Sequence, residues 1–390
     1  MSRLKAFALL VAFTQVCAFA ARAEESSSRL TTRPVREKKK SGLEKLAYKF
    51  TVGGLSFTES RDEAVAVQMD FNVRVDYRLL PWMKLRIEPR VELFSSRLQE
   101  WVESDEYRNK FQLDGTYLSL IPVREFEARA GAIRQDFHSN PLLISRRRTF
   151  PGVFAEVSSR NRPVKVTAIA QYVIPTSATL SDEREAMEAV PSFQTQSLGL
   201  SGRNHFLNWQ INGGHFGWRN LPDKVARASV QQGNTQLETG DAAEAVAGTK
   251  LKYGFDGYYW GGQICLCGES AFGVALEYSG LHNERAPNSV ADGQMLSIAP
   301  HLIFGDQEYE IKYSNYFLEP DATVAKYARR TFGFTNRVGD IVEASVRFRD
   351  RGFRLVGQWV NDRTVSDYQN SLQSTASQFA VWVETEYASF

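Results

Sequence analysis

Apolar and polar side chains alternate at every second position along most of the chain. Residues 65–77 are the clearest stretch, with Val, Met, Phe and Tyr on odd positions and Ala, Gln, Asp, Asn and Arg on even positions. This period predicts a β-strand, since successive side chains of a strand point to opposite faces. Strands of soluble sheets usually have about 5–6 residues. A run this long, at roughly 3.3 Å per residue, could cross a bilayer at a tilt.

Residues 82–93, WMKLRIEPRVEL, set a row of charges against a row of hydrocarbon. If the polar row faces water inside a barrel, its members and those of the preceding strand form the lumen wall. These predicted wall residues are Asp70, Arg74, Asp76, Lys84, Arg86, Glu88, Arg90 and Glu92. Pro89 has no backbone N–H to donate, so we expect a bulge or a broken ladder bond there.

The same alternation predicts sixteen strands, although 14 or 18 would also fit. They cover residues 46–58, 64–79, 82–95, 109–121, 125–135, 151–159, 163–174, 193–202, 205–216, 246–259, 268–280, 293–303, 307–318, 340–350, 353–362 and 376–388. Short and long connections alternate between them, as in outer-membrane barrels with short periplasmic turns and longer outer loops. Residues 327–336 are assigned to an outer loop, because another strand there would reverse the alternation.

These hairpins follow one another without a linker or a helical block, which disfavours a series of soluble sandwiches. The predicted fold class is therefore all-β, a transmembrane antiparallel up-and-down β-barrel. A closed barrel gives every backbone amide in lipid a partner. Aromatic residues near strand ends suggest girdles at the membrane interfaces. The predicted girdle residues are Tyr77, Trp82, Tyr117, Tyr172, Trp209, Tyr253, Tyr278, Tyr309 and Tyr387.

The first residues have the pattern of a secretory signal peptide. Arg3 and Lys5 precede the apolar run 6–20, and Ala21-Arg22-Ala23 offers a cleavage site. The apolar run is shorter than the roughly 20 residues that a membrane anchor needs. The predicted organisation is a signal peptide at 1–23, a basic disordered periplasmic leader at 24–45 and a barrel at 46–390.

Charge and cysteine content argue against a nucleic-acid-binding protein and a disulfide-stapled fold. The signal carries three basic residues and no acids, so 47 basic residues fall to 44 against 45 acidic ones. This balance gives no support to nucleic-acid binding. Cys265 and Cys267 are too few and too close for a disulfide framework, and no further metal ligands lie nearby in sequence. We expect a strained disulfide or two free thiols, and no metal site or other cofactor.

The chain ends in FAVWVETEYASF, with Phe379, Val381, Val383, Thr385 and Tyr387 on one face. This segment resembles the C-terminal strand by which the barrel assembly machinery recognises Gram-negative outer-membrane β-barrel proteins. The resemblance implies location in the bacterial outer membrane and contact with its lipids and lipopolysaccharide. Porins of this class are often trimers, so a homotrimer is a further expectation.

The third outer connection, residues 136–150, reads DFHSNPLLISRRRTF. In porins the third loop folds into the lumen, which would place Arg146, Arg147 and Arg148 at a constriction and favour anions. The alternatives are a loop that meets lipopolysaccharide phosphates and a solvated basic run. General porins have an acidic third loop opposite a basic wall, so their details do not transfer.

These features together predict a porin, a passive diffusion channel for small hydrophilic solutes with a mild preference for anions. The first alternative is a structural or adhesive barrel with a closed lumen. The second is a barrel enzyme, although none of the five histidines lies in a G-x-S-x-G or H-E-x-x-H motif. We therefore predict that the protein is not an enzyme.

Overall fold

The computed structural model describes residues 42–59, 63–96, 109–137, 140–159, 164–175, 189–237, 250–267, 271–366 and 373–389. The predicted signal peptide, 1–23, and leader residues 24–41 lie outside the described residues. No helix within the described ranges is long and apolar enough to cross a membrane.

The described residues form one antiparallel sheet. Its strands are β1 Gly42–Glu59, β2 Glu63–Leu80, β3 Met83–Ile87, β4 Pro89–Ser96, β5 Lys110–Leu113, β6 Tyr117–Leu120, β7 Phe126–Arg134, β8 Thr149–Ser158, β9 Val164–Val173, β10 Ser192–Arg203, β11 Asn208–Arg219, β12 Phe255–Leu266, β13 Phe272–Asn283, β14 Asp292–Phe304, β15 Gln307–Leu318, β16 Arg337–Phe348, β17 Phe353–Thr364, β18 Ala376–Thr385 and β19 Ala388–Ser389. The helical segments are η2 Gln135–Phe137, α3 Asp223–Gln231, η4 Ala325–Tyr327 and η5 Arg330–Phe332.

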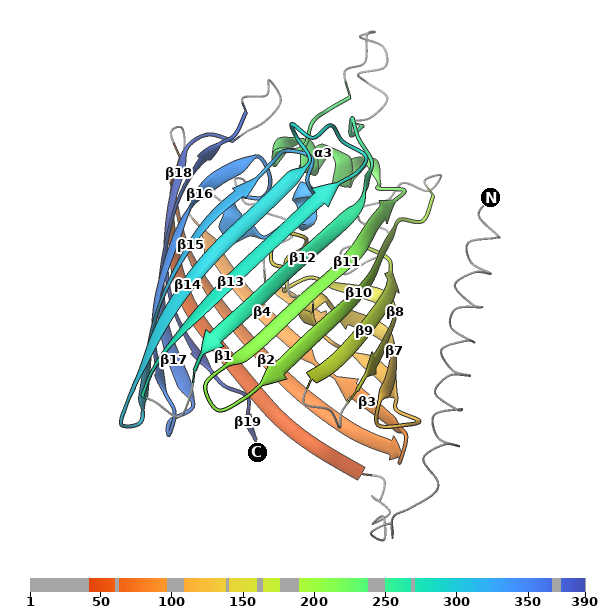
Figure 1. Ribbon diagram of the computed structural model, residues 1–390, viewed down its shortest axis with the longest axis vertical. Coiled ribbons are helices and arrows are strands. Elements are labelled where there is room, and N and C mark those ends of the chain that lie inside the picture. Colours follow the sequence, from red (N-terminus) through yellow and green to blue (C-terminus); the bar gives the residue numbers. More distant parts are fainter. Residues whose placement is uncertain are drawn as a thin grey trace. The chain divides into compact units, whose positions relative to one another are not determined.

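The sheet closes on itself as a barrel (Figure 1). Three pairs of short strands, β3 with β4, β5 with β6 and β18 with β19, each continue one another along the wall. Counted this way, the described residues build sixteen wall strands, each beside its neighbour in sequence. Strand β1 pairs with β2 on one side and with β18 on the other, from Thr51↔Glu384 to Glu59↔Ala376. The predicted all-β, sixteen-stranded antiparallel barrel is confirmed.

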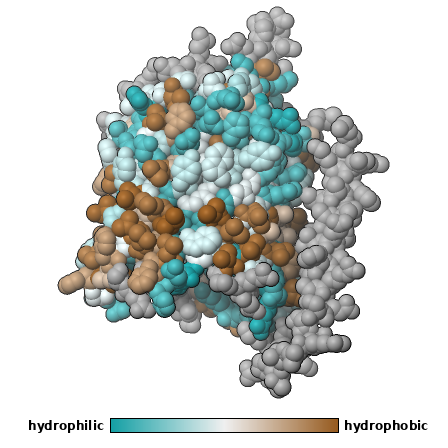
Figure 2. Space-filling model, viewed as in Figure 1, coloured by the Kyte–Doolittle hydropathy of each residue, from teal (hydrophilic) through white to brown (hydrophobic). Residues whose placement is uncertain are grey.

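The two faces of the wall differ in polarity. Along β2 the odd positions from 65 to 79 carry apolar residues that are exposed or half-buried, such as Val67 and Phe71, and most even positions carry partly or fully buried polar residues, such as Asp70. On the face shown in Figure 2 the apolar side chains form a band nearer the short-turn end, and the surface above it is mainly polar. The apolar band marks the part of the wall that suits lipid.

The wall is interrupted at Pro89, as predicted. Strand β2 keeps one register with β3 and β4 across the break. On the other side the register moves by one residue, between Arg86↔Tyr117 and Pro89↔Leu113. The extra residue lies in the opposing segment 114–116, where Gly115 has a φ of +51° that favours glycine. The ladder is therefore broken at Pro89, and the bulge belongs to its partner.

That bulge corrects one predicted girdle residue. Leu113 is exposed on the outer face, but after the extra residue the phase reverses and Tyr117 points into the lumen. Its hydroxyl accepts a hydrogen bond from Arg86 Nη1 at 2.9 Å. A second one-residue shift, between β18 and β19, likewise turns Tyr387 inward, where its hydroxyl donates to Glu88 at 2.6 Å. The expectation that Tyr117 and Tyr387 face lipid is wrong.

The other predicted girdle residues have several surroundings. Trp209 lies on the outer face against Gly202, and Tyr253 lies in the connection before β12. The remainder are exposed on the outer wall or its turns: Tyr77, Trp82, Tyr172, Tyr278 and Tyr309. Their place at the membrane interface stays a prediction.

Two predicted strand boundaries are also corrected. Strand β1 begins at Gly42, so residues 42–45 belong to the wall and not to the leader. Strand β12 begins at Phe255, nine residues later than expected, and contains Gly257, Gly261 and Gly262. The neighbouring backbone lies so close to Gly257 that a Cβ would overlap the carbonyl oxygen of His282. In the structure glycine lets the backbone of the neighbouring strand approach closely. In the sequence, glycines such as Gly261 indicated a turn, and this displaced the predicted strand.

The polarity of the wall can be tested with a charge on its outer face. We expect Phe71→Arg to lower the free energy of unfolding by about 2–4 kcal/mol, since Phe71 is 41% exposed on the apolar face and Arg is costly in lipid. Chemical denaturation of protein folded into lipid vesicles measures this. The control Gln68→Arg places the same charge beside Asp70 and Glu92 and should cost much less. Equal losses for both variants would contradict the assignment of faces.

Candidate functional site

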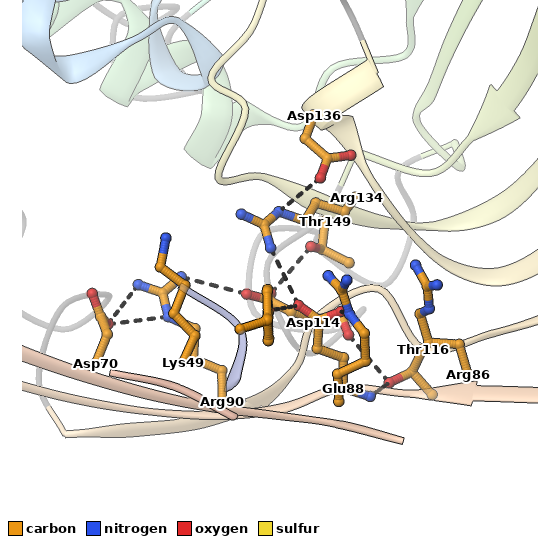
Figure 3. Close-up of polar contacts among 12 residues, drawn as sticks. Lys49, Asp70, Arg86, Glu88, Arg90, Asp114, Thr116, Arg134, Asp136 and Thr149 are labelled. Atoms are coloured by element: carbon orange, nitrogen blue, oxygen red, sulfur yellow. Dashed lines mark hydrogen bonds and ion pairs between the residues drawn. The ribbon is translucent and has the colours of Figure 1, made fainter. Parts of the chain in front are cut away.

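Several of the predicted wall charges, among them Asp70, Glu88 and Arg90, belong to a network of ion pairs (Figure 3). Arg90 lies between two aspartates, with its Nη2 2.7 Å from Asp70 Oδ1 and its Nη1 3.5 Å from Asp114 Oδ2. The same Nη2 is 2.8 Å from Glu92 Oε2. Thr149 donates to Asp114 at 3.1 Å, which links this group to β8. One arginine thus contacts three buried carboxylates.

Glu88 is the centre of a second group and is only 1% exposed. It accepts hydrogen bonds from Arg74 Nε at 3.0 Å and from Arg134 Nη1 at 3.3 Å. With Tyr387 it ties β2, β7 and the C-terminal end together. Removing one partner of such a buried pair would leave an uncompensated charge, at a cost of about 3–5 kcal/mol.

The remaining wall charges are paired too. Arg86 Nε lies 2.6 Å from Asp76 Oδ1, and Lys84 Nζ lies 2.8 Å from Glu44 Oε2. Arg78 also pairs with Glu44. Seven of the eight predicted wall residues therefore pair with one another, and Lys84 pairs with Glu44, so that opposite charges largely cancel.

The third outer connection, residues 136–150, turns into the barrel after β7. The Nδ2 of Asn140 donates to the carbonyl oxygens of Gly280, at 2.7 Å, and Trp260, at 3.2 Å. These residues lie on β13 and β12, several strands further round the barrel from β8. Leu142, Leu143 and Ile144 are fully buried. They pack in an apolar cluster with inward side chains of the wall.

A second inward segment, residues 319–336 between β15 and β16, holds the third connection in place. Thr323 Oγ1 donates to the carbonyl oxygen of Leu143 at 3.0 Å. The backbone N–H of Ser145 donates to the carbonyl oxygen of Tyr327 at 2.9 Å. Arg148 Nη2 donates to the carbonyl oxygen of Lys326 at 2.6 Å. The two segments are joined by both backbone and side-chain hydrogen bonds.

Tyr327 is the main aromatic contact of this assembly. Its ring stacks on Trp218 with centroids 5.0 Å apart and meets the edge of Phe150 at 5.4 Å. The guanidinium of Arg148 lies over the same ring, 5.6 Å from its centroid. Its hydroxyl donates to the carbonyl oxygen of Pro175. Sequence alternation gave no signal for this role, because Tyr327 lies outside the strands.

The connection containing α3 completes the packing at the loop end (Figure 1). Asn234 accepts from the backbone N–H of Ala325 at 2.8 Å and donates to the carbonyl oxygen of Thr323 at 2.9 Å. Asp321 accepts from the backbone N–H of Thr235 at 3.0 Å. Three connections therefore interlock inside one end of the barrel.

Two cavities border this assembly. One, of about 330 Å³, is lined on the wall side by Gln68, Asp70 and Gln358, and the other has about 170 Å³. Arg146 and Arg329 line both cavities, and Arg147 lines the larger one. Burial and the neighbouring arginines lower the pKa of Arg329 to about 10, while Glu343 and Glu277 oppose this shift. Its side chain remains cationic at neutral pH.

The structure separates the three arginines predicted at the constriction. Arg146 and Arg147 are exposed beside the cavities, whereas Arg148 is half-buried against Tyr327. Arg329 joins the first two, although 182 positions separate Arg147 from Arg329 in sequence. Sequence analysis missed Arg329, since it placed residues 327–336 in an outer loop without a contact to the third connection.

Two groups of described residues bring metal-ligating atoms within 4.8 Å of one another. The first is Cys265, Cys267 and His301, and the second is His215, Asp256 and Glu284. In the second group Asp256 is already paired with Arg219 and with His215, whose Nε2 is 2.6 Å from Asp256 Oδ1. The first group contains the two cysteines, which form a disulfide. Sequence spacing alone did not indicate that His301 lies beside them.

The link between Asp321 and Thr235 should depend on pH. Burial raises the pKa of Asp321 from 3.8 to about 6, opposed by the hydrogen bonds from Thr235 and the charge of Lys252. The neutral form of Asp321 stabilises the packing of residues 319–327 inside the barrel. This stabilisation is complete below about pH 4 and is lost as the pH rises through about 6. The shift corresponds to about 3 kcal/mol.

We therefore expect amides of residues 319–327 to be better protected from hydrogen exchange at pH 5 than at pH 8, after correction for intrinsic exchange rates. In Asp321→Asn the difference between the two pH values should disappear. Asp306→Asn, in the turn between β14 and β15, is the control. Protection of this segment that increases with pH would contradict the assignment.

No protein-family model matches the sequence, and no curated protein sequence matches it. Solved structures resemble it at 10% sequence identity. Pseudomonas putida OprB at high pH has a TM-score of 0.58 and covers 90% of this chain and 94% of its own. OmpTdeltaL8, a loop deletion mutant of an outer membrane protein of Vibrio cholerae, has a TM-score of 0.52 with 87% and 98% covered. Acinetobacter baumannii OccAB1 has a TM-score of 0.50 with 91% and 99% covered. The chain thus has the fold of the porin-like β-barrels of the bacterial outer membrane.

Proposed function

We propose that the protein is a passive diffusion channel for small hydrophilic solutes with a preference for anions. The observation that supports this most directly is the meeting of Arg146, Arg147 and Arg329 at the two lumenal cavities. Rings and clusters of arginine favour anions in a narrow aqueous pore. Selection would come from the width of the pore and its charge, without a chemical reaction.

The balance of charge explains why Arg147 and Arg329 would contribute most to the potential at the cavities. Wall arginines such as Arg90 and Arg74 are neutralised by adjacent carboxylates. Within the described part of the chain, Arg147 and Arg329 form no ion pair with a carboxylate, although Asp70 lines the same cavity. A positive potential at the narrow part of the lumen therefore depends mainly on the two inward segments.

Arg148 has a different role in this proposal. It contacts Lys326 and the ring of Tyr327, so it holds the third connection against residues 319–336. We infer that it positions the narrow part of the lumen without setting its charge directly. The prediction that all three consecutive arginines line a constriction is thereby restricted to Arg146 and Arg147.

Contact with outer-membrane lipids and lipopolysaccharide, and insertion by the barrel assembly machinery, are the partners that we propose from the fold. The apolar band of the outer wall supports the contact with lipid (Figure 2).

Reversal potentials in planar bilayers test the proposed selectivity. With a salt gradient, the refolded protein should show stepwise conductance and a reversal potential on the anion-selective side. The combined variant Arg146→Ala, Arg147→Ala and Arg329→Ala should lose this preference, because little net positive charge remains at the narrow part. Arg351→Ala, in the short turn between β16 and β17, is the matched control and should behave like the parent.

Two outcomes would contradict the proposal. An unchanged reversal potential in the triple variant would remove the role of these arginines. A complete lack of conductance from correctly folded protein at high load would exclude a pore and favour the closed structural or adhesive barrel.

A further inference from the structure

Cys265, Cys267 and His301 form a cluster at the short-turn end of the barrel. Leu266 is 59% exposed on the outer face, so alternation places Cys265 on the lumen face of β12. On β14 the exposed residues Ile298 and Leu302 occupy even positions, so His301 faces the lumen. The two sulfurs and an imidazole nitrogen lie within 4.8 Å of one another. Short turns of outer-membrane barrels face the periplasm, which places the cluster there.

Strand β13 lies between the two strands that carry the cluster, and Gly273 makes the contact across it. Gly273 pairs with His301, and Cys265 pairs with Ala275 of the same strand. A Cβ at Gly273 would overlap Cε1 and Nε2 of His301. The imidazole therefore occupies the space that any other residue at position 273 would fill, and this directs it along the wall toward the cysteines.

The cluster is accessible from the lumen. Cys265 lines a cavity of about 550 Å³ together with Gln210, Gln263 and Lys165. A metal ion or a small reductant could reach the sulfur through this water-accessible space.

We propose that Cys265 and Cys267, once reduced, bind a thiophilic metal ion, Zn²⁺ or Cu⁺, together with His301. Two thiolates and one imidazole are a ligand set that suits both ions. A tetrahedral zinc site has metal–sulfur bonds of about 2.3 Å and metal–nitrogen bonds of about 2.0–2.1 Å, so three atoms in this cluster are close enough to share one ion. The fourth position would face the lumen, where water or a solute could occupy it.

The proposed site requires a change of redox state, because the cysteines form a disulfide in the structure. A dithiol reductant would transfer two electrons and two protons, so that its own thiols become a disulfide while Cys265 and Cys267 become thiols. Binding of the metal then releases one proton from each thiol. The oxidised protein should not bind the ion at this site, since a disulfide sulfur is not a thiolate ligand.

Absorption spectroscopy with Co²⁺ as a probe for the zinc site tests this proposal. The full chain carries Cys17→Ser in every sample, which leaves two cysteines, and is folded in detergent, reduced and freed of reductant without oxygen. We expect one Co²⁺ per chain with a thiolate-to-cobalt charge-transfer band, displaced by one equivalent of Zn²⁺. A parallel titration with Cu⁺ and a competing chelator shows which of the two ions is preferred.

Matched variants assign the ligands. The band should be absent in Cys265→Ser with Cys267→Ser, and His301→Ala should weaken affinity by more than about tenfold. Gly273→Ala should also weaken it, because its Cβ displaces the imidazole. His205→Ala, in the turn between β10 and β11, should bind like the parent. Circular dichroism of each variant confirms that the barrel has formed.

Three results would overturn the proposal. They are no charge-transfer band in the reduced parent, equal binding by the reduced and the oxidised parent, and unchanged affinity in His301→Ala. The comparison of reduced with oxidised parent needs no variant, so it remains decisive if a substitution prevents folding. Because the readout is the bound metal, it is independent of whether the barrel conducts anions.

Discussion

The rest of this structure depends on one constraint, the need of each backbone N–H and C=O group in lipid for a hydrogen-bond partner. Strand β1 meets this need by pairing with both β2 and β18, which joins the two ends of the barrel. Where Pro89 interrupts the ladder, neighbouring groups take part instead. The N–H of Glu88 donates to Thr116 Oγ1 at 3.1 Å, and its carbonyl oxygen accepts from the N–H of Asp114 at 2.8 Å. The break is therefore repaired locally from the adjacent strand segment.

Closing the barrel creates a second requirement, because sixteen strands enclose more space than their own side chains fill. At the loop end this space is occupied by apolar residues from three connections and from the inner face of the wall. Tyr327 lies among them, between Trp218 and Phe150. The apolar packing fixes the third connection, and the polar side chains at its edge remain beside water. Arg146 and Arg147 owe their positions to the burial of Leu142, Leu143 and Ile144.

The two kinds of charged residue in the lumen have different consequences. Wall residues such as Arg90 and Glu88 are surrounded by opposite charges, so they stabilise the strands and contribute little net potential. Arg147 and Arg329 of the inward segments form no ion pair with a carboxylate within the described residues. Position in the fold, more than the number of charges, decides which of them can influence a passing solute. Position in the fold also decides the proposed metal site at the short-turn end of the barrel. There Gly273 leaves room for the imidazole of His301 beside Cys265 and Cys267.

The sequence by itself determined that the chain folds as long strands with alternating faces, because a lipid face and a water-filled lumen impose opposite chemistry on neighbouring residues. It favoured sixteen wall strands and left 14 and 18 open. It also located the break at Pro89, whose missing donor is a local property. It could not place Tyr117 or Tyr387, since a single extra residue reverses the phase of a strand. The predicted start of β12 was wrong because glycines occur both in turns and in closely packed strands. Only the tertiary structure decided that Arg329 joins Arg146, that Arg148 contacts Tyr327 and that His301 reaches Cys265. These contacts join segments far apart in the chain, and they arise from the closure of the barrel and the packing of its interior, which no local pattern encodes.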